Sequence, residues 1–152
     1  EMEKKIIFIG ADSAGYTLKE YIKKHLEDLG YTVNDCGTDS EASCHYPIFA
    51  SAVCEKVLES NGGAYGILIC GTGIGMSMCA NKYNGIRAAV CSDTFSAKMT
   101  RRHNDANVLC IGARVIGECL AEDIVESFLT NEFEGGRHQI RVDMMSEIEG
   151  KN

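Results

Sequence analysis

The chain has 152 residues and a net charge of −7 at pH 7, and 45% of its residues are hydrophobic. This length predicts one domain, residues 1–152, that can bury a core without disulfides or metals. The negative charge and the absence of a lysine or arginine run argue against a nucleic-acid partner, and no apolar run is long enough to cross a bilayer. We therefore expect neither a nucleic acid nor a membrane as a partner.

Eight cysteines raise the question of a disulfide or zinc framework. None of them forms a C-x-x-C pair. Four of them end apolar, strand-like runs, where cysteine packs as a small hydrophobe: Cys36, Cys70, Cys91 and Cys110. We therefore expect reduced thiols and a cytoplasmic protein.

The first part of the chain alternates between apolar runs and helical spacing. A buried strand over 5–10 precedes a helix over 17–29, and a strand over 31–36 precedes a helix over 48–60. Pro47 suits the first turn of that second helix because a proline there leaves no helical hydrogen bond unmade.

Polar side chains follow the first strand and precede the second helix. Asp12 and Ser13 come just past the carboxyl end of the first strand, and Tyr46 lies where the chain returns to the sheet. Asp12 could equally cap the following helix, and Tyr46 could simply pack. The residues alone leave these alternatives open.

The stretch around Cys70 organises the rest of the chain. An apolar run over 67–69 predicts a strand buried on both faces, and residues 76–82 favour a helix. Glycines that let the backbone approach a ligand occupy alternate positions between them: Gly71, Gly73 and Gly75. A helix start attracts anions and should promote ionisation of a neighbouring thiol.

This loop does not match either common nucleotide motif. It lacks the Gly-Lys-Ser/Thr of a Walker A sequence, and Met76 replaces the third glycine of the dinucleotide fingerprint. The loop by itself predicts an anion site. Cys70 could be chemical, or it could be a buried packing residue at a strand end.

The second part of the chain continues the alternation. Its predicted elements are strands over 87–91 and 108–111, helices over 94–102 and 120–129, and a last helix that residues 135–141 open and that runs towards Glu149. Asp93 is placed to cap the first of these helices, and His103 ends it, as a histidine that satisfies a helix dipole often does. Arg114 follows the last strand. Arg137 and Arg141 are four residues apart on one helix face, a spacing that suits a phosphate.

Strand–helix alternation predicts an α/β sandwich of three layers with a mostly parallel, five-stranded sheet and an extra C-terminal helix. In such sheets ligands bind beyond the carboxyl ends of the strands. Asp12, Cys70, the glycine loop and Arg114 converge on that edge, which favours a functional role for Cys70.

These residues resemble the type B ribose-5-phosphate isomerase family, which includes isomerases of galactose 6-phosphate and allose 6-phosphate. The resemblance covers nearly the whole chain in order and spacing. It is carried by residues 10–15 (GADSAG), 46–47 (YP), 69–76 (ICGTGIGM), 102–108 (RHNDANV), 112–114 (GAR) and 134–139 (EGGRHQ).

The resemblance implies a Rossmann-like or flavodoxin-like fold and a homodimer, or a tetramer built from it, with active sites between subunits. It implies neither a metal nor an organic cofactor. The implied reaction interconverts ribose 5-phosphate and ribulose 5-phosphate through an enediolate, a step of the non-oxidative pentose phosphate pathway.

The resemblance also assigns roles to single residues. Cys70 would be the base, Thr72 would assist at the sugar oxygens and His103 would help to open the cyclic sugar. The oxyanion and hydroxyl contacts would come from Asp12, Ser13, Tyr46, Gly71, Gly73, Ile74, Gly75 and Asn104. The phosphate would be held by Arg114, Arg137 and Arg141, some of them from the other subunit.

One residue departs from the family pattern. The family usually has a histidine where this chain has Ser13. Serine lacks the charge and reach of histidine, which leaves open a six-carbon substrate such as allose or galactose 6-phosphate. A non-catalytic sugar-phosphate-binding subunit is a further alternative, although Cys70 and His103 are both present. A nucleotide-binding module is disfavoured by Met76.

Overall fold

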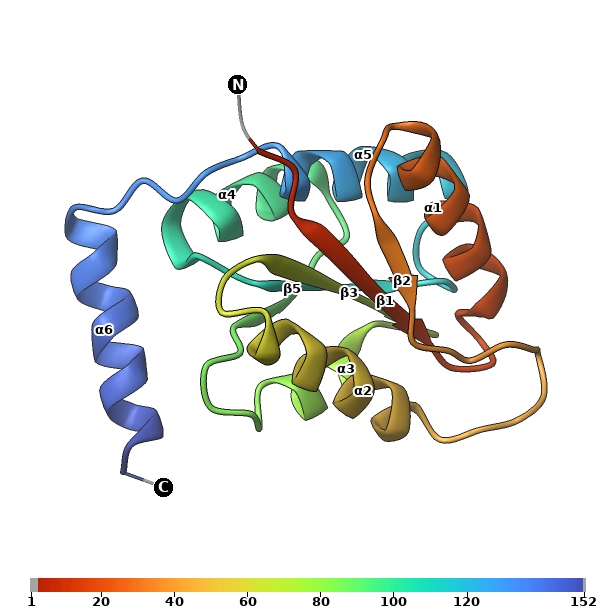
Figure 1. Cartoon of the computed structure of the whole chain (residues 1–152), viewed down its shortest axis with the longest axis horizontal. Coiled ribbons are helices and arrows are strands. Elements are labelled where there is room, and N and C mark those ends of the chain that lie inside the picture. Colours follow the sequence, from red (N-terminus) through yellow and green to blue (C-terminus); the bar gives the residue numbers. More distant parts are fainter. Residues whose placement is uncertain (1–2, 152) are drawn as a thin grey trace.

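The computed structural model describes residues 3–151 and contains one sheet of five parallel strands (Figure 1). The strand order is β2-β1-β3-β5-β4. The strands are β1 (Ile6–Ala11), β2 (Val33–Asp35), β3 (Ala64–Cys70), β4 (Ala88–Val90) and β5 (Val108–Gly112). Every residue of the central strand β3 is buried, which explains why it reads as an unbroken apolar run.

Helices cover both faces of the sheet, as Figure 1 shows. The helices are α1 (Tyr16–Asp28), α2 (Tyr46–Glu59), α3 (Ile74–Ala80), α4 (Thr94–Asn104), α5 (Glu118–Leu129) and α6 (Arg137–Glu149). One core cluster joins the sheet to α1, α4 and α5, and a second joins it to α2 and α3. The predicted three-layer α/β sandwich with a parallel sheet is confirmed.

The predicted elements are all present, with shifted ends. Helix α3 begins at Ile74, two residues before the predicted start, so Ile74 and Gly75 belong to its first turn and not to the loop. Helix α2 begins at Tyr46, with Pro47 in its first turn as predicted. The predicted cap of α4 is confirmed, because Oδ1 of Asp93 accepts a hydrogen bond from N–H of Ser96 at 2.7 Å. Helix α4 extends two residues beyond its predicted end, to Asn104.

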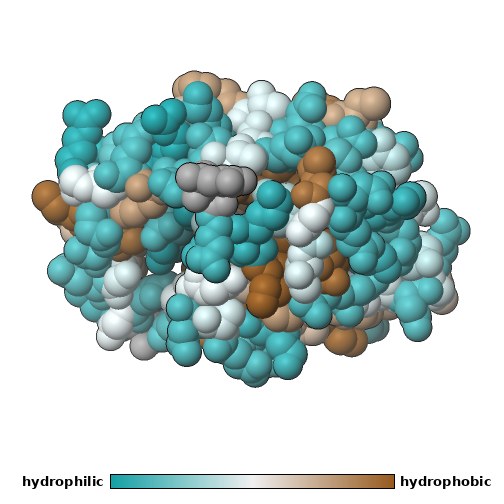
Figure 2. All heavy atoms as spheres, turned by 45° about the horizontal axis from the view of Figure 1, so that its top comes forward, coloured by the Kyte–Doolittle hydropathy of each residue, from teal (hydrophilic) through white to brown (hydrophobic). Residues whose placement is uncertain are grey.

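Helix α6 lies beside the sandwich, at the left of Figure 1. His138 and Val142 are its buried residues, and it packs against α4. Its exposed side carries Ile140 and Met144, which are 63% and 57% exposed. Figure 2 shows hydrophobic spheres at the left end of the molecule, where α6 lies. Within residues 3–151, no helix is both long and apolar enough to span a membrane.

Candidate active site

The carboxyl edge of the sheet brings together the residues that follow β1, β3 and β5. Ala11 pairs with Ile69, and Cys70 pairs with Gly112. Asp12 therefore follows β1 on one side of Cys70, and Arg114 follows β5 on the other. The predicted meeting of these residues at one edge is confirmed by the strand register.

The loop after β3 holds the Cys70 sulfur with a backbone donor. N–H of Gly73 donates to Sγ of Cys70 at 3.1 Å, and N–H of Ile74 donates to Oγ1 of Thr72 at 3.2 Å. Gly73 has φ +79°, and a Cβ on it would lie 2.9 Å from the backbone carbon of Ile111. Only glycine fits this conformation and spacing. The loop thus directs one amide, that of Gly73, at a sulfur that is buried but lies at the strand end.

The turn after β1 is fixed against the same strand. N–H of Asp12 donates to O of Ile69 at 3.2 Å, and Oδ1 of Asp12 accepts from N–H of Gly15 at 3.0 Å. Asp12 therefore stabilises its own turn. The N-cap residue of α1 is Gly15, so Asp12 is not the helix cap that its position also suggested. Asp12 and Ser13 are both half-buried, and both remain at the site edge.

Two side chains lie against glycines of the loop. A Cβ on Gly75 would lie 2.7 Å from Cε1 of Tyr46, so the tyrosine ring packs directly on the start of α3. A Cβ on Gly71 would lie 3.5 Å from Cδ of Arg114 and 3.6 Å from its Nη1. The arginine thus brings positive charge to the loop next to Cys70, as a phosphate or enediolate contact requires.

The other buried thiols do not share this environment. Burial raises the pKa of Cys54 to about 12 and that of Cys91 to about 11. Burial also raises the pKa of the fully enclosed Cys110 thiol well above its ordinary value. These three remain neutral thiols at physiological pH, so they are packing residues rather than proton carriers.

His103 and Asn104 lie at the opposite edge of the sheet. Helix α4 ends with them, and O of Asn104 accepts from Nε of Arg87, the residue that precedes β4. The two edges lie at the two ends of β5, whose five residues are joined by four steps. At about 3.3 Å per step the separation is roughly 13 Å. One chain therefore does not bring His103 and Asn104 to its own Cys70.

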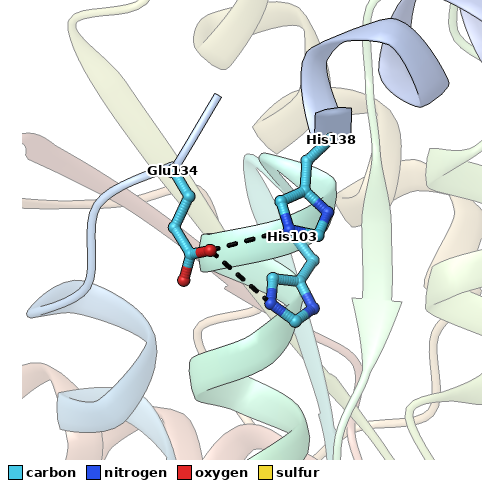
Figure 3. Close-up of side chains that lie close together, drawn as sticks. All are labelled: His103, Glu134 and His138. Atoms are coloured by element: carbon cyan, nitrogen blue, oxygen red, sulfur yellow. Dashed lines mark ion pairs between the residues drawn. The ribbon is translucent and has the colours of Figure 1, made fainter. Parts of the chain in front are cut away.

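His103 belongs to a compact cluster at this amino edge (Figure 3). Its ring stacks on that of His138 with centroids 4.1 Å apart and planes 9° apart. Oε1 of Glu134 lies 3.8 Å from Nε2 of His103 and 3.6 Å from Nε2 of His138. Within residues 3–151, this is the only group of three histidine, cysteine or carboxylate side chains arranged to hold a metal ion.

Sequence reasoning gave no role to Glu134 and His138. Their signal in the sequence is the segment 134–139 (EGGRHQ), which carries part of the family resemblance. Glu134 precedes the first residue of α6, so helical spacing does not indicate that it meets His138. Arg137 opens α6 beside this cluster, and Arg141 follows one turn later, with both side chains exposed. The structure thus groups these arginines with His103, away from Arg114.

A model of the ribose/galactose isomerase family matches residues 7–145. The chain belongs to this family. Among its curated relatives is ribose-5-phosphate isomerase B of Escherichia coli, which is 50% identical over 148 residues, or 96% of this chain and 97% of the relative. The resemblance drawn from the motifs is confirmed.

Solved structures of family members have the same fold. Ribose-5-phosphate isomerase B of Clostridium thermocellum matches with a TM-score of 0.93 and 50% identity, covering 95% of this chain and 97% of that one. The Mycoplasma genitalium enzyme with bound ribulose-5-phosphate matches with a TM-score of 0.94 and 40% identity, covering 99% and 100%.

Proposed function

We propose that this family member interconverts ribose 5-phosphate and ribulose 5-phosphate through an enediolate, with Cys70 as the base. The observation that carries the proposal is the hydrogen bond from N–H of Gly73 to Sγ of Cys70 in the glycine loop after β3. A relative with the same fold holds ribulose-5-phosphate. The family also includes galactose isomerases by its description.

The chemistry explains why a thiol and amides stand together. A hydrogen on the carbon next to a carbonyl is weakly acidic, so its removal requires stabilisation of the developing oxyanion. In the proposed step Cys70 takes the proton from C2 of the open aldose and returns it to C1, while the hydroxyl proton passes from O2 to O1. Amides of residues 71–75 and the Thr72 hydroxyl hold the enediolate oxygens between the two transfers, and Asp12 and Tyr46 contact hydroxyls.

The remaining roles fall to the groups at the amino edge. His103 acts as acid and base in opening the furanose ring, because an imidazole exchanges protons near neutral pH. Asn104 contacts a sugar hydroxyl. Arg137 and Arg141, together with Arg114 of the carboxyl edge, bind the phosphate, whose distant charge supplies binding energy for positioning.

We further propose that two copies of the chain form each active site. The half-site with Cys70 and the half-site with His103 lie on opposite edges of the sheet, roughly 13 Å apart along β5. A symmetric pair can place one half-site of each copy against the other half-site of its partner. The exposed Ile140 and Met144 on α6 provide apolar surface for that contact.

Mixing two inactive variants tests this arrangement. Cys70→Ala and His103→Ala are each expected to be inactive alone. If every site combines residues of two chains, a heterodimer has one intact site, and random pairing restores about a quarter of the wild-type activity. Activity that stays at zero after denaturation and joint refolding, with dimers present, would contradict a shared site.

The substrate is tested by measuring turnover of ribose 5-phosphate, allose 6-phosphate and galactose 6-phosphate side by side. Ser13 is the observation that favours a six-carbon substrate as second candidate, since it leaves room that a histidine would fill. We expect the highest kcat/KM with ribose 5-phosphate. No turnover of any of the three would favour the non-catalytic binding subunit.

Two organisational proposals accompany this function. We propose one domain over residues 1–152, which is supported by two core clusters built on one sheet. We also propose a cytoplasmic location, which is supported by eight cysteines that are all free thiols.

A further inference from the structure

The cluster of His103, Glu134 and His138 offers a donor set that the proposed reaction does not use in full. Oε1 of Glu134 lies 3.8 Å and 3.6 Å from the two Nε2 atoms, which exceeds hydrogen-bond length. All three ligand atoms lie within 4.8 Å of one another. We propose that this cluster binds one divalent transition-metal ion of the Zn²⁺ class and that the ion inhibits the enzyme.

The distances are close to those of a tetrahedral site. Bonds of about 2.0–2.1 Å from Zn²⁺ to nitrogen or oxygen place neighbouring ligand atoms about 3.3–3.5 Å apart. Each nitrogen–oxygen separation is within a few tenths of an ångström of that range. The stacked rings turn both Nε2 atoms towards Glu134 (Figure 3). An ion lies in the plane of each imidazole that binds it, so the two rings, whose planes are 9° apart, must leave their stack to share one. The His103 side chain, which is 40% exposed, has room to turn.

The carboxylate is held ready for a single bond to an ion. Oε2 of Glu134 pairs with Nε of Arg102 at 2.8 Å, and N–H of Glu134 donates to O of Arg102 at 3.0 Å. These contacts orient the side chain and leave Oε1 towards the histidines, as the outer partners of metal ligands commonly do. Arg137 and Arg141 nearby oppose a cation, so we expect micromolar affinity rather than that of a structural zinc site.

The donor types select the kind of ion. Two imidazoles and one carboxylate with an open fourth position are a frequent set for Zn²⁺, whereas Mg²⁺ and Ca²⁺ prefer oxygen ligands. Neutral imidazole is the form that binds metals, so the site should bind an ion more tightly as pH rises.

An ion at this cluster would occupy Nε2 of His103 and restrain the ring. The inhibitory half of the inference rests on the proposed role of His103 in ring opening, while the binding half does not. Inhibition would be reversible, and a chelator would remove it.

The binding test is a Co²⁺ titration of the full chain after treatment with a chelator. We expect one Co²⁺ per chain with tetrahedral absorption bands, displaced by Zn²⁺. His138→Gln and Glu134→Gln should each weaken binding by more than about tenfold. His25→Gln is the matched control, because His25 also faces two carboxylates, Glu122 at 3.5 Å and Glu126 at 3.0 Å. It should bind Co²⁺ like the wild type.

Three results would overturn the metal site. They are the absence of saturable Co²⁺ binding, binding that both folded variants leave unchanged, and sulfur-to-cobalt charge-transfer bands that show cysteine ligands. If His138→Gln does not fold, Glu134→Gln decides, since it preserves shape and removes only charge.

The activity test compares Zn²⁺ inhibition of wild type and Glu134→Gln. We expect the concentration for half inhibition to rise more than about tenfold in the variant. Binding at the cluster without inhibition would overturn the inhibitory half. A wild type that binds the ion but isomerises no sugar would contradict the proposed function and leave the metal site standing.

Discussion

Replacing Cys70 with alanine should separate catalysis from stability. The side chain is 5% exposed and lies in one core cluster with the fully buried Cys54. Loss of one buried sulfur costs about 1 kcal/mol of folding free energy. Loss of the acceptor for N–H of Gly73 costs about 1 kcal/mol more. A total of about 2 kcal/mol leaves a domain of ordinary stability folded.

The effect on activity should be far larger than this. Removal of a base that transfers the proton should lower kcat at least about 100-fold. Cys70→Ser keeps an acceptor for Gly73, so it should be more stable than the alanine variant, yet nearly inactive because an alcohol is much less acidic than a thiol. The assay is ketose formation from saturating ribose 5-phosphate, with exchange of the substrate C–H against deuterium oxide as a second readout.

Cys54→Ala is the matched control. It removes the same atoms from the same core cluster, where burial raises the pKa of the thiol to about 12. We expect a similar loss of stability in a denaturant titration and a normal kcat. Near-normal kcat in folded Cys70→Ala, or equal loss of activity in both alanine variants, would refute the assignment of Cys70 as the base.

Four further variants test the phosphate contacts, the substrate length and the packing of the first turn. Arg137→Ala and Arg141→Ala should each raise KM for sugar phosphates, because each loses a charge-assisted contact worth about 1.5–3 kcal/mol. An unchanged KM in both variants would show that these arginines do not bind the phosphate. Ser13→His should lower kcat/KM for a six-carbon sugar more than for ribose 5-phosphate, because imidazole fills the space of the extra carbon; an unchanged ratio would show that this position does not set sugar length. Gly15→Ala should lower the free energy of unfolding by about 1–3 kcal/mol, since its Cβ would lie 2.4 Å from O of Ile69. Gly117→Ala is the control and should not lower the free energy of unfolding in this way, because its Cβ would have no atom within 4 Å. Equal denaturation midpoints for the two variants would contradict the packing argument.

Local sequence signals determined most of the secondary structure. The apolar run before Cys70 predicts a doubly buried strand, and β3 is buried at every residue. Asp93 correctly predicts the start of α4, because its side chain caps the amide of Ser96, which is only three residues away. The start of α3 was misplaced by two residues because glycine at position 75 disfavours helix in isolation, whereas here it admits the ring of Tyr46.

One part of the candidate site follows from local sequence patterns, and another part depends on contacts between distant segments. Residues that follow parallel strands must share one edge, so the neighbourhood of Asp12, Cys70 and Arg114 follows from strand order along the chain and the carboxyl-end rule. Whether Gly112 pairs beside Cys70 depends on β5 lying next to β3, a contact between segments far apart in sequence.

Only the tertiary structure decided where His103 belongs. Sequence reasoning joined it to Cys70 through family resemblance, but α4 runs back across the sheet and delivers it to the amino edge. There it stacks on His138, which α6 brings from a distant part of the chain. Helix packing, which no local pattern encodes, thus places His103 and Cys70 at two different edges, and this separation is the reason for proposing a site shared by two copies of the chain.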